Sequence, residues 1–185
     1  MALLERWANE MIVDDTTFEQ IVNTHYQPLY RFAFSLARSE AQACDLTQET
    51  FRKFATKAHQ IEAESKIKTW LFTTLYREFI DSHRRDSRLQ PLDDVEHETG
   101  SVMAADQAER FDGGLAREAL LQLDPVFRAP LVLFYLQDHT YREIADVLDV
   151  PLGTVMSRIS RGRGMLRELL QDRCRPAVLA PVTHA

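Results

Sequence analysis

The sequence predicts an all-α protein made of two small helical domains joined by an acidic flexible linker. Only six glycines occur in 185 residues, and apolar residues recur at helical spacing in nearly every segment, without the alternation of half-buried strands. Residues 86–114 differ from the rest, with eight acidic side chains against two arginines. This stretch holds the whole net charge of −6, which predicts a linker that is either simply solvated or placed in a basic channel.

The expected domain limits follow from this division. We expect an N-terminal extension over residues 1–14, a first helical domain over 15–88, the acidic linker over 89–114, a second helical domain over 115–174 and a tail over 175–185. Both domains fall near the lower end of the size range of folded domains, which begins at about 50 residues.

Composition excludes several classes of protein. Hydrophobic residues at 45% and charged residues at 27% are typical of a folded chain, and the net charge of −6 argues against coating nucleic acid by bulk charge alone. Cys44 and Cys174 are far apart, and the histidines lack the spacing of metal ligands. We therefore expect no disulfide framework, no zinc site or other metal, and no cofactor.

Two features bear on location. The first 15 residues carry Glu5, Arg6 and Glu10, where a secretory signal needs an unbroken apolar run. The longest apolar run, residues 129–136, is far shorter than the roughly 20 residues that cross a bilayer. We therefore expect a cytoplasmic protein without membrane insertion.

Three helices are expected in the first domain. An apolar stripe over residues 18–36 is interrupted by Pro28, which predicts a kink or a restart. Ser39 and Gln42 have the capping-box spacing that starts a second helix, whose polar face holds Gln42, Asp45, Glu49, Arg52 and Thr56. A third helix is expected over about 65–85, with a core stripe of Ile67, Leu71, Phe72, Leu75 and Phe79.

Trp70 falls outside that core stripe. Helical rotation places it in a sector roughly 60° wide that also contains Lys66, Thr73, Arg77 and Arg84. An aromatic ring among cations is suited to hold single-stranded nucleic acid, because the ring stacks on bases while the cations follow the phosphates. The alternative is a packing tryptophan beside ordinary solvated charges.

The pattern of the second domain indicates a helix-turn-helix. Asp124 and Pro125 signal the start of a helix that continues to Leu136, and Thr140 with Glu143 forms a capping box that opens a short helix. A three-residue turn leads into a last helix, whose outward face holds Met156, Ser157, Ser160, Arg161, Arg163 and Arg167. Residues 151–175 are net +4, which favours duplex DNA binding over an ordinary solvated helical hairpin.

Over about residues 15–172 the chain resembles the bacterial extracytoplasmic-function sigma factors of the sigma-70 family. Residues 45–51 (DLTQETF) resemble the polymerase-binding motif of sigma region 2, and residues 68–72 (KTWLF) through 81–85 (DSHRR) resemble its promoter-melting helix. Residues 123–128, 140–145 and 153–158 resemble sigma region 4, which recognises the −35 element. The two motif sets stand in the order that the family has.

The resemblance implies an alternative sigma factor that binds RNA polymerase core and directs it to promoter DNA, with an anti-sigma factor or a Ser/Thr kinase as regulator. The beta and beta-prime subunits of the polymerase would bind Asp45, Gln48, Glu49 and Arg52. The melted −10 strand would bind a loop and the helix after it, namely Gln60, Ile61, Glu62, Ala63, Glu64, Ser65, Lys66, Trp70, Thr73, Arg77 and Arg84. The −35 duplex would bind Thr154, Met156, Ser157, Arg158, Ser160, Arg161, Arg163 and Arg167.

Several positions depart from the family pattern. Gln42 and Cys44 stand where members usually carry Asp or Glu, which depletes the acidic polymerase-binding motif. Glu78 replaces a usual Asn and is expected to bring a negative charge to the strand-binding face. Asp149 replaces a usual turn Gly, and Met156 replaces a usual Lys.

Thr56 is a candidate phosphorylation site. It lies on the same helix face as Asp45 and Glu49, and threonine phosphorylation in this region activates some groups of the family that lack the acidic motif. A phosphate adds about −1.5 to −2 charge, comparable to two missing carboxylates. The alternative is an exposed threonine without a role.

Two other classes of protein stay open on the residues alone. A helix-turn-helix repressor or activator would be a dimer that matches palindromic half-sites, and a helical adaptor would bind no DNA. An enzyme is not expected, because no carboxylate pair, nucleophile with a base or glycine-rich phosphate loop is present.

Overall fold

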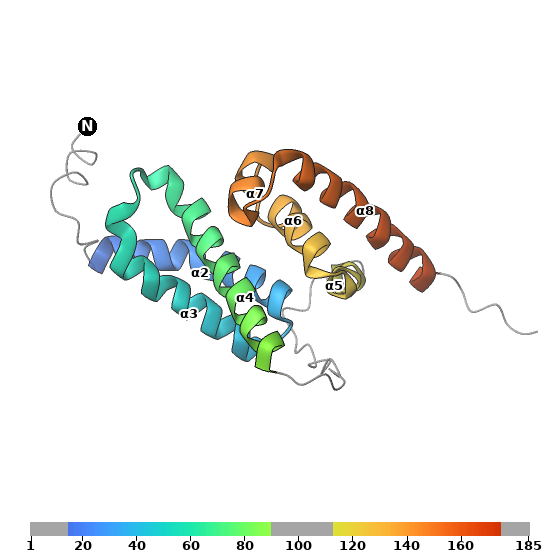
Figure 1. Ribbon diagram of the computed structural model, residues 1–185, viewed down its shortest axis with the longest axis horizontal. Coiled ribbons are helices and arrows are strands. Elements are labelled where there is room, and N and C mark those ends of the chain that lie inside the picture. The colour runs from blue at the N-terminus through green and yellow to red at the C-terminus, as the bar shows by residue number, and fades with distance from the viewer. Residues whose placement is uncertain (1–14, 90–112, 175–185) are drawn as a thin grey trace, which may run out of the picture.

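The structure, a computed structural model, describes residues 15–89 and 113–174 (Figure 1). The expected N-terminal extension, nearly all of the linker and the tail lie outside these residues. Within the two ranges every regular element is helical, as predicted. Helices α2 to α4 form the first domain and helices α5 to α8 form the second.

Helix α2 (Asp15–Ala37) opens the first domain and runs unbroken through Pro28, so the helix does not restart there. Proline removes one backbone hydrogen bond from a helix. The fully buried side chains of Leu29, Phe32 and Ala33 directly follow it, and their packing against α3 and α4 holds the helix together.

Helix α3 (Glu40–Lys57) begins at the predicted cap, where Ser39 Oγ accepts from the Gln42 N–H at 3.4 Å. The return bond of a full capping box is absent from the described residues, so Ser39 is a simple N-cap. Two short 3-10 turns, Ala58–Gln60 and Glu64–Lys66, then lead into α4 (Ile67–Leu89). All five residues of the predicted core stripe of α4 are buried.

The second domain contains α5 (Gly113–Gln122), α6 (Pro125–Tyr135), α7 (Tyr141–Leu148) and α8 (Leu152–Cys174). Asp124 caps α6 by accepting from the Val126 N–H at 2.8 Å. Thr140 and Glu143 form both bonds of the capping box of α7.

The turn between α7 and α8 has the geometry of a helix-turn-helix. Asp149 adopts the left-handed conformation, with φ of 54°, where the family usually has glycine. Aspartate tolerates this backbone better than most residues. Val155 and Ile159 then bury the inner face of α8, so the predicted helix-turn-helix is present.

The two domains pack against each other, α6 on α2 and α7 on α4. Lys68 Nζ donates to the Gln137 carbonyl at 2.6 Å, and Arg128 Nη2 donates to the Leu36 carbonyl at 3.1 Å. The rings of Phe72 and His139 meet edge to face, with centroids 4.7 Å apart. No sequence pattern predicted these contacts, because each joins residues that are far apart in the chain.

Candidate nucleic-acid interface

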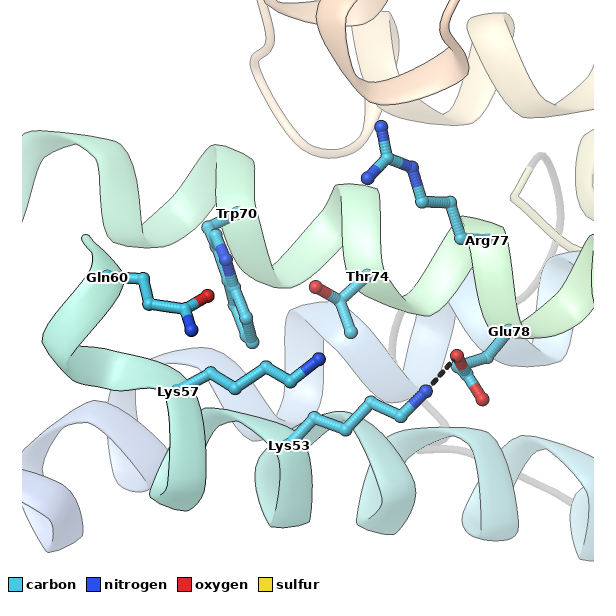
Figure 2. A pocket seen from close by; sticks show the side chains of 7 residues that line it. All are labelled: Lys53, Lys57, Gln60, Trp70, Thr74, Arg77 and Glu78. Carbon is cyan, nitrogen blue, oxygen red and sulfur yellow. Dashed lines mark hydrogen bonds and ion pairs between the residues drawn. The ribbon is translucent and has the colours of Figure 1, made fainter.

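A cleft of about 230 Å³ lies between α3 and α4 on the basic side of the first domain. Figure 2 shows its lining, with Trp70 and Gln60 toward one end and the Lys53–Glu78 ion pair at the other. The lining residues are Lys53, Lys57, Gln60, Trp70, Thr74, Arg77 and Glu78. Three cations against one carboxylate make this cleft attractive to a polyanion.

Trp70 both packs and lines the cleft. Its ring meets the fully buried Phe54 edge to face at a centroid distance of 5.8 Å, and the residue is half-buried. The remainder of its surface borders the cleft. The packing interpretation is therefore correct for one side of the ring, while the other side is available to a ligand.

The other residues predicted for the −10 strand have different environments. Gln60 lies in the cleft, whereas Ile61 is buried and its side chain belongs to the core. Lys66 is exposed and pairs with Glu62 at 2.7 Å. Thr73 is half-buried and donates to the Thr69 carbonyl. The remaining side chains are exposed or half-buried, namely Ala63, Glu64, Ser65, Arg77 and Arg84.

Sequence reasoning missed three cleft residues, Lys53, Lys57 and Thr74. For Thr74 the spacing carried a signal, because it lies four residues after Trp70 and four residues before Glu78 along α4. Glu78 had been expected to bring a negative charge to the strand-binding face. Its carboxylate is paired with Lys53 Nζ across the cleft, which compensates that charge.

The predicted −35 residues of helix α8 are exposed or half-buried. Met156, Ser157, Ser160, Arg161, Arg163 and Arg167 are all exposed. Thr154 and Arg158 are half-buried. Burial raises the pKa of Tyr76 in α4, and the nearby Arg158 guanidinium opposes that rise, so Arg158 lies on the side of α8 that faces the first domain.

The predicted polymerase-binding face of α3 is exposed but poor in free negative charge. Asp45 and Gln48 are exposed, whereas Glu49 accepts two hydrogen bonds from Arg52 at 2.6 Å. These bonds lower the pKa of Glu49. Thr56 is exposed on the same helix, and its hydroxyl donates to the Lys53 carbonyl at 3.0 Å. The face thus offers Asp45 as its principal uncompensated carboxylate.

Within the described residues no helix is both long and apolar enough to span a membrane.

Comparison with known proteins covers both domains. The family model "Sigma-70 region 2" matches residues 21–89, and the model "Sigma-70, region 4" matches residues 114–166. The chain is 33% identical over 160 residues to the ECF RNA polymerase sigma factor SigE of Mycolicibacterium smegmatis, covering 83% of this chain and 62% of that protein. It is 26% identical to RNA polymerase sigma factor SigV of Bacillus subtilis, covering 79% and 86%.

A solved structure agrees with these sequence matches. The sigma factor RpoE of Bartonella quintana, crystallised with the anti-sigma factor NepR, is 31% identical, with a TM-score of 0.68 and coverage of 83% of this chain and 96% of that one. The matches decide against a dimeric repressor and against an adaptor that binds no DNA. The chain therefore belongs to the extracytoplasmic-function group of the sigma-70 family and is an RNA polymerase sigma factor.

Proposed function

We propose that this sigma factor holds melted promoter DNA in the α3–α4 cleft and recognises the upstream duplex with α8. The observation that carries the first assignment is the half-exposed Trp70 in a cleft whose lining has three cations and one carboxylate. A base that stacks on this ring would place its phosphate near Lys57, which lines the same cleft. The chain works in the cytoplasm with core polymerase and promoter DNA, and it performs no catalysis of its own.

Run-off transcription with purified core polymerase tests the assignment of the cleft. Trp70→Ala should bind core normally but weaken binding of single-stranded promoter DNA by roughly 1 to 3 kcal/mol, the measured range for loss of one stacking partner. Trp70→Phe keeps an aromatic face and should restore most of this binding. Normal promoter opening by Trp70→Ala would show that the tryptophan serves only packing.

We also propose that the exposed face of α3 docks on the beta and beta-prime subunits and that negative charge at Thr56 strengthens docking. This rests on the Glu49–Arg52 pair, which leaves the face with little uncompensated charge. Phosphorylation would add about −1.5 to −2 charge to an accessible hydroxyl.

A titration against core polymerase tests the role of Thr56. Phosphorylated protein and Thr56→Glu should bind more tightly than wild type. Thr24→Glu adds the same charge at an exposed threonine on α2 and should have no effect, because it lies off the docking face. Equal affinities for all four proteins would eliminate the switch.

We also propose an anti-sigma protein as a partner, because this chain is similar to an RpoE that was crystallised with an anti-sigma factor.

A further inference from the structure

The recognition helix α8 begins with two exposed apolar side chains. Leu152 is 45% exposed and Met156 is 52% exposed, four residues apart and therefore on one face. Farther along the helix the same face carries Ser160, Arg163 and Arg167, all exposed. The face is thus apolar at its N-terminal end and cationic toward its C-terminal end.

Single exposed hydrophobic residues are common on protein surfaces and need no explanation. This pair differs by its position. In a helix-turn-helix, the N-terminal residues of the second helix contact base edges. In this protein the N-terminal end of α8 is fixed in position by three features, namely the capped helix α7, the left-handed backbone of Asp149 and the buried side chain of Val155.

The first turn of α8 is also open to close approach by a ligand. A Cβ atom at Gly153 would meet nothing within 4 Å, so the backbone beside Leu152 faces empty space. The major groove of DNA has one apolar feature at its base edges, the C5 methyl group of thymine. The arginines farther along α8 favour a polyanionic ligand over an apolar protein surface.

We propose that Met156, supported by Leu152, recognises thymine by contact with its C5 methyl group in the upstream promoter duplex. This inference rests on the proposed function, in which α8 enters the major groove. It also accounts for methionine at a position where the family usually has lysine. A lysine adds affinity for phosphates of any sequence, whereas an exposed thioether chain gains binding energy only where apolar surface is present.

Replacement of thymine by uracil tests the proposal at the level of one methyl group. Holoenzyme assembled from the full chain and core polymerase would first select its preferred upstream sequence from duplexes randomised over the −35 region. Each thymine of the selected sequence would then be replaced singly by deoxyuridine. We expect at least one replacement to weaken binding about fourfold, which corresponds to about 0.8 kcal/mol for one buried methyl group.

Variants of exposed residues decide which side chain senses the methyl group. Met156→Ala should bind the thymine and uracil duplexes equally, and Met156→Lys should bind both more tightly than Met156→Ala while still not distinguishing them. Met165→Ala is the matched control, because Met165 is exposed on the same helix but lies nine residues farther along, about 14 Å. It should keep the fourfold difference.

Three results would overturn the inference. Uracil replacements without effect in the wild type would exclude methyl recognition, and a methyl effect that persists in Met156→Ala would assign it to another residue. In both cases the selected sequence would still support the proposed function. Failure of the holoenzyme to select any upstream sequence would instead contradict the proposed role of α8, and the inference would fall with it.

Discussion

Helix α8 approaches α6 closely at Gly162, and replacement of this glycine by alanine gives a sharp test of the packing of the second domain. A Cβ atom at Gly162 would lie 2.9 Å from Leu131 Cδ1 and 3.3 Å from the Phe127 carbonyl oxygen. Leu131 is buried and the carbonyl belongs to the backbone of α6, so neither neighbour can move away easily. Overpacking of this kind costs typically 1 to 3 kcal/mol.

Gly164 provides the matched control, since a Cβ atom there would meet nothing within 4 Å. Alanine is favoured over glycine inside a helix by up to about 1 kcal/mol at both positions. Gly164→Ala should therefore stabilise the protein slightly, and Gly162→Ala should be less stable than Gly164→Ala by about 1 to 3 kcal/mol in urea unfolding. Equal stabilities of the two variants would refute the close approach of α8 to α6.

Three further predictions concern charge. Arg167→Ala should weaken binding to all promoters alike and lower the slope of log affinity against log salt by about one, as expected for an exposed phosphate contact; a change confined to some sequences would argue for base recognition. Glu78→Gln removes the one carboxylate of the cleft lining, so the affinity of the protein for single-stranded DNA should rise, and the slope of log affinity against log salt should steepen by about 0.7. A loss of affinity would show instead that the Lys53–Glu78 pair itself organises the site. Burial, with Lys68 nearby, lowers the pKa of His139 from 6.5 to about 4. Because unfolding lets this histidine take up a proton between pH 6.5 and pH 4, stability should fall as the pH decreases through that window, and His139→Gln should be less sensitive to pH there than wild type.

Local signals made most helix boundaries predictable from the sequence. The cap at Asp124 and the capping box of Thr140 and Glu143 depend on residues within one turn, so their side chains mark the same boundaries in the structure. Pro28 shows the limit of this reasoning. Its local tendency to break a helix is outweighed by the tertiary packing of Leu29 and Phe32, which a local pattern does not contain.

The candidate cleft was predicted in part for a similar reason. Trp70 and Arg77 share one face of a single helix, so helical periodicity was enough to group them. Lys53 and Lys57 come from the neighbouring helix α3, and their contribution depends on how α3 packs against α4. The ion pair of Lys53 with Glu78 links residues 25 positions apart, beyond the reach of any periodic pattern.

The contacts between the domains set a requirement on the proposed function. In this structure Lys68 of α4 touches Gln137, which lies just before α7, so the two candidate DNA-binding domains are in direct contact. The −10 and −35 elements are about 25 base pairs apart, or about 85 Å along B-form DNA at about 3.4 Å per base pair. Residues 90–112 could span at most about 80 Å when fully extended. The fully extended linker is therefore slightly shorter than this distance, and the domains themselves must span the remainder. If the proposed function is correct, the contact between Lys68 and Gln137 has to break before both elements are bound at once.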